Sequence, residues 1–469
     1  MYAWNHLRRL TQLGVVVSAL LSATHVAASD QEDVASTELK PGSAIPLTEL
    51  KLGSATATTE QHEGHQTPQG SHEGHGGDTG IAATREGSGT SWLPDESPMY
   101  ALHVRSRDWT LMLHGRAYLQ YLHESSDRGS EQTGSINWLM VAADRPAGAG
   151  HLTLRGMFSA EPWTIRDCGY PDLLATGERC DDEAIHDRQH PHDLFMELAA
   201  RYDRPLGRGV HLQLYGGPVG EPALGPVAFV HRVSALSNPL APITHHWFDS
   251  THITYGVATA GLYGKRWKAE ASAFNGREPD EDRTDVDLAA MDSWSGRLWY
   301  LPDARWAFQL SAGRLAEAEA GHDGEPPIDV DRVTASATYH RTGAGGTVWA
   351  TTIGWGRNAE RDGEATMAWL VESAVAIREH HTWFGRVEWS EKSGHDLAVA
   401  SDAIFDVSKL QGGYTYDFAS WKGLTPGVGV SASASIVPRD LEAIYGDRLT
   451  PGFAIFLTLR PASAQTASP

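Results

Sequence analysis

Histidines in the N-terminal region are the first residues of this sequence whose type and spacing suggest chemistry. The unit HEGH occurs twice, and it supplies His62, His65, His72 and His75. Imidazole is a good ligand for Zn(II), Cu(II) and Ni(II), and the short spacing in a glycine-rich stretch lets two rings chelate one ion. We therefore predict a divalent-metal site here. The alternative is a solvated linker whose histidines bind nothing.

A second group of histidines lies in two later segments, near 185–193 and 231–252. The candidate ligands are His186, His190, His192, Asp193, His231, His245, His246 and His252. If both segments are loops at one mouth of a barrel, their side chains converge, and Cu(II), Zn(II) or Ni(II) is the expected ligand class. Pro191 keeps the backbone extended, so the rings of His190 and His192 project to opposite sides. The alternative is a folded loop cap in which the histidines only form hydrogen bonds.

Enzyme motifs are absent from the sequence. It contains no G-x-S-x-G, H-E-x-x-H or P-loop pattern. Ser250 lies near His252, but no oxyanion-stabilising device accompanies the pair. We therefore predict that the protein is not an enzyme, with a membrane-embedded hydrolase as the minor alternative, and that its only candidate cofactors are Cu(II), Zn(II) or Ni(II).

Charge and N-terminal composition restrict the compartment and the partners. The chain carries 38 basic and 59 acidic side chains, a net charge of -21, which argues against nucleic-acid binding. Residues 1–28 combine a basic start, a short apolar run and a small-residue cleavage site, as in a secretion signal. After it, the sequence has no apolar run long enough for a transmembrane helix.

The two cysteines, Cys168 and Cys180, lie close together in one polar stretch. In an oxidising compartment such a pair is expected to form a disulfide, and a thiolate metal site is the minority alternative. Residues 29–98 are rich in Ser, Thr, Gly, Glu and His and lack periodicity, so we predict a disordered tail.

Strands are predicted from about Tyr100 onward by alternation of apolar and polar residues. In residues 110–122, Leu111 and Leu119 share one face, whereas Arg116 and Gln120 share the other. Short turns are expected at 144–150, 203–209, 264–266, 302–305, 342–346, 378–380 and 420–423, and longer polar loops near 124–133, 162–192, 219–250, 276–291, 317–327, 358–365, 391–401 and 437–450. This strict alternation predicts an all-β, antiparallel, up-and-down transmembrane barrel of about 16 strands with both termini at one end. A soluble β-sandwich or propeller is the alternative.

Two sets of side chains are assigned from this barrel pattern. Tryptophans on or near strand ends are expected in interfacial girdles: Trp138, Trp294, Trp306, Trp355, Trp369, Trp383 and Trp389. Charged residues of both signs are expected in the lumen: Arg116, Arg155, Arg201, Arg297, Arg386, Glu161, Glu197, Glu270 and Glu388. The apolar, Gly- and Pro-rich stretch 215–229 is either a cap on the rim or an inward constriction loop.

Over residues 100–460 the sequence resembles Gram-negative outer-membrane β-barrels of the porin type. The HEGH-bearing leader resembles the His-rich leaders of outer-membrane copper-resistance proteins, although it lacks the methionines typical of them. The implied organisation is a signal peptide (1–28), a periplasmic tail with the HEGH units (29–98), an outer-membrane barrel (99–460) and a C-terminal tail (461–469).

These features imply passage or handling of small solutes, with divalent metal ions as the favoured cargo. The partners would be outer-membrane lipid, small solutes or metal ions, and a periplasmic protein contacting the tail. A non-transporting structural or surface-binding protein is the alternative.

Overall fold

The computed structural model describes residues 79–180, 183–319, 327–361 and 363–462. The predicted signal peptide, the four histidines of the HEGH units and residues 463–469 lie outside the described residues. None of the described helices is long and apolar enough to cross a membrane.

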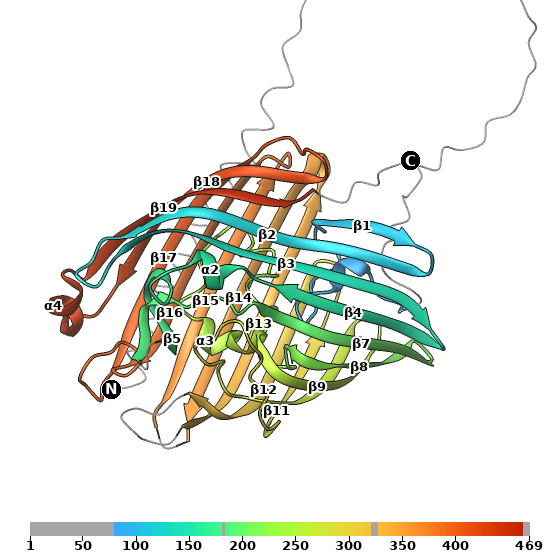
Figure 1. Cartoon of the computed structure of the whole chain (residues 1–469), viewed down its shortest axis with the longest axis horizontal. Helices are drawn as coiled ribbons and strands as arrows, with labels where there is room; N and C mark the ends of the chain where they lie inside the picture. Colours follow the sequence, from blue (N-terminus) through green and yellow to red (C-terminus); the bar gives the residue numbers. More distant parts are fainter. Residues whose placement is uncertain (1–78, 181–182, 320–326, 362, 463–469) are drawn as a thin grey trace, which may run out of the picture. The chain divides into compact units, whose positions relative to one another are not determined.

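A closed antiparallel barrel forms the body of the described chain (Figure 1). The described residues contain a 17-stranded sheet, in which β1 (Ala101–Ser106) is an extra strand beside sixteen barrel strands. Each barrel strand pairs with the next along the chain, and β19 pairs with β2 to close the ring. The barrel strands are β2 (Trp109–Glu124), β3 (Glu131–Ala147), β4 (Gly150–Phe158), β7 (Phe195–Gly207), β8 (Val210–Gly220), β9 (Thr254–Tyr263), β10 (Trp267–Phe274), β11 (Ser293–Tyr300), β12 (Trp306–Glu319), β13 (Ile328–Gly343), β14 (Thr347–Glu360), β15 (Ala365–Ile377), β16 (His381–Ser393), β17 (Ile404–Asp417), β18 (Leu424–Ile436) and β19 (Leu449–Pro461). The predicted fold class is confirmed.

Short elements occupy the connections. A hairpin of β5 (Tyr170–Cys180) and β6 (Glu183–Gln189) lies between β4 and β7. The described helical turns are η1 (Ala83–Arg85), α2 (Glu161–Thr164), α3 (His245–Phe248), η2 (Ser250–His252), η3 (Ala344–Gly346), η4 (Arg439–Leu441) and α4 (Glu442–Tyr445). Tight turns such as 148–149 and 208–209 alternate with longer connections such as 159–194 and 221–253. The predicted alternation is therefore confirmed.

The two faces of the barrel have opposite polarity. On β2, Leu119 is 52% exposed on the outer face, whereas its neighbour Gln120 is 3% exposed in the lumen. The last strand shows the same pattern, with Ile455 and Leu457 outside and Thr458 inside. An apolar outer face and a polar interior are the reverse of a soluble barrel and are typical of a barrel that spans a lipid bilayer.

The predicted lumenal charges are confirmed, and the predicted girdle is correct only in part. All nine charged residues assigned to the lumen are buried. Trp294 and Trp383 are exposed near strand ends, as expected. Trp138 was wrongly assigned to the girdle, because it stands opposite Arg116 in the β2–β3 register and therefore points into the lumen.

Three of the described segments enter the lumen. They are the N-terminal segment (79–98), the connection 159–194 with its hairpin, and the connection 221–253, hereafter the inward loop. Residues 87–94 and every residue from 219 to 249 are buried. The Gly- and Pro-rich stretch is thus an inward loop.

Residues 79–98 correct the predicted tail boundary. They were assigned to the disordered tail on composition, yet Trp92 and Leu93 pack against Val227, Val233 and Tyr263 in a buried cluster.

Candidate functional site in the barrel lumen

Charged side chains of the barrel wall hold the N-terminal segment. Arg155 of β4 donates to the carbonyl of Gly89, and Lys268 of β10 donates to that of Thr90. Arg201 of β7 forms an ion pair with Glu86. Each of these cations also pairs with a carboxylate of the wall, so the contacts with the segment add buried acceptors to cations that the wall already holds in place.

The start and end of the segment are tied to the tight-turn end of the barrel. Both guanidinium edges of Arg85 are used: Nε and Nη2 each lie 2.7 Å from Asp95, and Nη1 donates to the carbonyl of Lys265 at 2.7 Å. The Oγ of Ser97 lies 2.7 Å from Nδ1 of His340 on β13. Glu96 contacts Arg305 in the turn after β11, at 2.9 Å. The segment is therefore fixed at several points around the wall.

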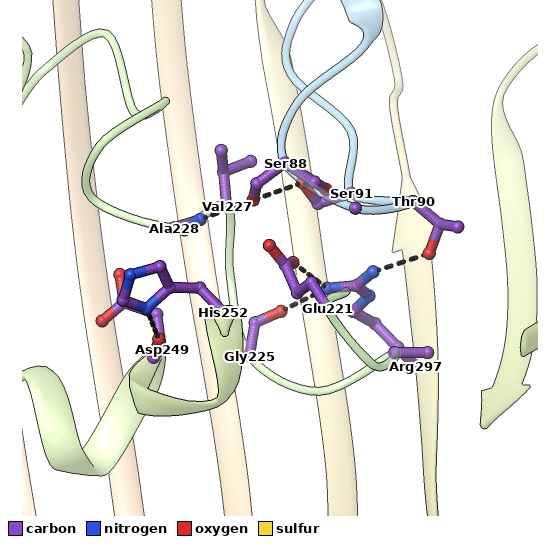
Figure 2. A network of polar contacts seen from close by, with 12 residues as sticks. Ser88, Thr90, Ser91, Glu221, Gly225, Val227, Ala228, Asp249, His252 and Arg297 are labelled. Carbon is purple, nitrogen blue, oxygen red and sulfur yellow. Dashed lines mark hydrogen bonds and ion pairs between the residues drawn. The ribbon is translucent and has the colours of Figure 1, made fainter. Parts of the chain in front are cut away.

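Arg297 of β11 joins the N-terminal segment, the inward loop and the wall (Figure 2). Its guanidinium lies 3.0 Å from Oγ1 of Thr90, 3.1 Å from the carbonyl of Gly225, 3.4 Å from Glu221 and 2.9 Å from Glu270. A second link joins the same two segments, since the backbone N–H of Ala228 donates to Oγ of Ser88 at 2.9 Å.

Glu221 and Gly89 meet at this junction. Gly89 has φ of +51°, and a Cβ there would lie 2.7 Å from Cβ of Glu221, so only glycine fits. Burial raises the pKa of Glu221 to about 7, although Arg297 and a hydrogen bond from Ser88 oppose the shift. The carboxyl is therefore partly protonated near neutral pH while the two segments are docked.

The inward loop crosses the lumen to the opposite wall. Arg232 binds Asp249 within the loop at 2.9 Å and Glu372 of β15 at 2.5 Å. Arg386 of β16 also contacts Glu372, at 3.1 Å, and donates to the carbonyl of Leu240 at 2.9 Å. A buried carboxylate between two guanidiniums is thus the main electrostatic attachment on this side.

Four predicted histidine ligands form one contact group, His192, His245, His246 and His252, and the ring centroid of His246 lies 5.5 Å from that of His245. Ring centroids of His252 lie 5.4 Å from His192 and 5.1 Å from His245. Each Nδ1 faces an acceptor: Glu161 at 3.0 Å for His192, the Asp249 carboxylate at 2.8 Å for His245, and the Asp249 carbonyl at 2.8 Å for His252. The predicted convergence of the two loops holds for these residues.

Their protonation differs because their surroundings differ. Burial lowers the pKa of His192, but the adjacent Glu161 outweighs burial and the net pKa is raised. Burial lowers the pKa of His245 more than Asp249 raises it. The pKa of His252 falls well below its usual value through burial and the neighbouring imidazoles. Protonation is therefore favoured at His192 and disfavoured at His245 and His252.

His186, His190 and Asp193 lie outside this group of rings, and His246 has a carboxylate partner of its own. Nδ1 of His190 lies 3.1 Å from Glu178, which also pairs with Arg283, and Asp193 is 3.7 Å from Arg283. His246 lies 3.1 Å from Glu278 and packs over Gly177, where a Cβ would clash with its ring. His186 contacts the carbonyl of Ala184 at 3.1 Å.

His231 is apart from these histidines. Its Nε2 lies 3.4 Å from the sulfur of Met157 on β4.

Within the described residues, the group of His, Cys, Asp and Glu side chains with metal-like spacing is Asp280, Asp285 and Asp287. These carboxylates lie in the connection after β10, two of them exposed, and such acidic groups are common without an ion. Divalent-metal binding by the loop histidines therefore stays a prediction. The same holds for His62, His65, His72 and His75, which lie outside the described residues.

The predicted disulfide between Cys168 and Cys180 is present, with a Cα–Cα distance of 5.8 Å. It joins a residue two positions before β5 to the last residue of that strand, on one arm of the lumenal hairpin. The hairpin is attached to the wall by Lys409, whose Nζ lies 2.6 Å from Asp172 and 2.7 Å from Glu124.

Sequence reasoning missed the N-terminal segment as part of the site. The available signal is Trp92-Leu93-Pro94 beside Arg85, an apolar and basic patch that interrupts an otherwise polar leader. His114 was also missed as a candidate, although the strand pattern places it on the lumenal face.

No family model and no curated protein matches this chain. Similar solved structures include OmpT, an outer membrane protein of Vibrio cholerae, with 9% identity and a TM-score of 0.43 over 76% of this chain and 99% of that one. An anion-selective porin from Comamonas acidovorans has 10% identity and a TM-score of 0.44, over 75% and 99% of the two chains. Salmonella typhi OmpF, in a complex with daunomycin, has 10% identity and a TM-score of 0.46, over 76% and 100%. Similarity at this level identifies no function.

Proposed function

We propose that this protein is a gated outer-membrane barrel for small polar solutes, closed at rest by the N-terminal segment and the inward loop. A barrel of about 16 strands is wide enough to hold an aqueous path when its lumen is not filled. The observation that carries the proposal is the junction at Arg297. The guanidinium of this one wall residue contacts both segments, Thr90 of the N-terminal segment and Gly225 of the inward loop, as well as Glu270 of the wall. Such polar contacts exchange readily for water, unlike the backbone ladder of the barrel.

The lumen also explains the class of solute. Arg155, Arg201 and Lys268 face Glu197 and Glu270 along the wall, so an opened path would present both signs of charge. A path with both signs suits hydrated polar solutes rather than apolar ones.

Conductance across planar bilayers tests the proposal. The full chain is expected to show brief, infrequent openings, and a chain lacking residues 79–98 is expected to open more often and for longer, with the inward loop still attached to β15. A chain lacking residues 29–78 is the control, because it shortens the same end of the protein and leaves the docked segment intact.

A second candidate function is a non-transporting surface or structural protein, and the filled lumen favours it. If neither the full chain nor the chain lacking 79–98 conducts, this second function replaces the first. Equal, steady conductance in both chains would show that the segment does not close the path.

A further inference from the structure

Methionines gather along one side of the lumen. Met112, Met140, Met157 and Met196 belong to a cluster around Trp138, and Met99 lines the cavity beside Met112 and Met140. We call these five residues the methionine wall. The whole chain has eight methionines, so most of them lie in this one region.

Two imidazoles stand against the methionine wall. Nε2 of His231, on the inward loop, lies 3.4 Å from Sδ of Met157. The ring of His114, on β2, has its centroid 5.7 Å from that of His231, and Trp138 lies 4.8 Å from both rings. β2, β4 and the inward loop thus bring two imidazole rings and a thioether together.

The tautomer of His114 follows from its backbone contact. Its Nδ1 lies 2.6 Å from the carbonyl of Tyr100, which can only accept, so Nδ1 carries the proton and Nε2 has a free lone pair. Metal-binding histidines are commonly oriented by such a contact at the other ring nitrogen.

The separation of His231 and Met157 fits two ligands of one ion. Metal–nitrogen bonds of about 2.0 Å and metal–sulfur bonds of about 2.3 Å at a tetrahedral angle place the two atoms roughly 3.5 Å apart. The observed distance is 3.4 Å. His114 and His231 both line a cavity of about 80 Å³, which gives an ion a place to enter beside the rings.

The ligand types select the ion. Thioether and imidazole favour Cu(I) over hard cations, which prefer oxygen ligands. The carboxylates that line the same cavity already have partners, because Glu86 pairs with Arg201 and Asp144 accepts from the hydroxyl of Thr153. A neutral ligand set leaves less charge unbalanced with a monovalent ion than with a divalent one.

We propose that His114, His231 and Met157 form a binding site for a soft monovalent cation, Cu(I) or Ag(I). The cavity beside it is also lined by Ala83, Glu86 and Gly87 of the N-terminal segment, so undocking that segment exposes the site to the tight-turn end. The site goes beyond gated passage, and it exists whether or not the barrel conducts. The alternative is a histidine that donates an N–H···S hydrogen bond in an apolar core.

Binding of Ag(I), and of Cu(I) under anaerobic conditions, is measured on the folded full chain by competition with a chromophoric chelator. Met157→Leu conserves volume while removing the sulfur. Removing a direct ligand is expected to weaken the affinity of this site for the ion by at least about tenfold. That is the lower end of the loss found when outer-shell partners are removed. Met196→Leu is the matched control, a thioether in the same cluster, and is expected to bind like the native chain.

Trp138 gives a local signal, because its ring centroid lies 4.8 Å from those of both His114 and His231. An ion bound by these two rings is expected to quench its fluorescence. That quench should be absent in Trp138→Phe and in Met157→Leu, and present in Met196→Leu. Affinity unchanged by Met157→Leu, or weakened equally by Met196→Leu, would overturn the proposal. So would binding of Zn(II) alone. Conductance plays no part in this assay, so each proposal fails or stands by itself.

Discussion

Trp92→Ala is expected to release the N-terminal segment while leaving the barrel wall intact. Trp92 is 2% exposed and makes an edge-on contact with Tyr263, with ring centroids 5.8 Å apart. Two cations lie over its ring, Arg85 at 4.9 Å and Lys268 at 5.1 Å. The indole is therefore the main apolar anchor of a segment otherwise held by polar contacts.

The magnitude follows from the burial of the ring. Replacing a buried Trp by Ala typically costs about 3–5 kcal/mol. Because the barrel strands keep their own ladder of backbone hydrogen bonds, this cost falls mainly on the docking of the segment. At about 1.4 kcal/mol per tenfold change, docking weakens by roughly two to three and a half orders of magnitude.

Single-channel recording and limited proteolysis of the same preparation measure the effect. The open fraction should rise by up to the calculated factor, and cleavage after Arg85 should become fast. Trp421→Ala is the control, because Trp421 is 68% exposed in the turn between β17 and β18. If Trp92→Ala leaves both the open fraction and the cleavage rate at the level of Trp421→Ala, the indole does not hold the segment and the reasoning is wrong.

Three further predictions concern other parts of the structure. Burial raises the pKa of Glu221 to about 7 in the docked state, so protonation of this carboxyl favours docking, and that contribution is lost as the pH rises through about 7. The open fraction should therefore increase between pH 5 and pH 8. Glu221→Gln should remove that pH dependence. Cys168→Ser with Cys180→Ser removes a crosslink whose sequence separation is 12 and should cost about 3 kcal/mol, seen as faster hydrogen exchange in β5 and β6 with unchanged exchange in β13 and β14. Leu119→Arg, on the outer face, should destabilise the barrel in lipid by about 2–4 kcal/mol in urea unfolding, whereas Leu449→Arg, in the first position of β19, should cost less; equal costs would contradict the proposed bilayer-facing surface.

The barrel was predictable because its signal is local. Alternation along residues 110–122 separates Leu119 from Gln120, and the inward or outward direction of each side chain follows from the pleat alone. The same parity argument placed Arg116 and Arg297 in the lumen correctly. Trp138 was misplaced because its residue type, and not its position in the strand, was used. It lies two residues from Met140 on β3, so both side chains point to the same face, the lumen.

The contents of the lumen were less predictable because they depend on contacts between distant segments. The composition of residues 79–98 indicates disorder, and their order comes from wall cations more than fifty residues away, such as Arg155. His192 and His245 were expected to converge, and they do, but the acceptors Glu161 and Asp249 that orient them come from α2 and from the inward loop itself. His114 has no sequence motif and acquires significance only beside Met157 and His231.

The ring closes where β2 meets β19, and this junction is shorter than its neighbours. β19 pairs with β2 from Ala117 to Glu124, whereas β1 pairs with the remaining edge, from Trp109 to His114. These two strands are also the most distant in sequence of any pair in the ring, so their meeting carries the largest loss of chain entropy. Residues 79–98 lead directly into this junction. During biogenesis they reach the lumen either before this seam pairs or through the tight-turn mouth of the closed barrel, so the order of assembly is part of how the lumen is filled.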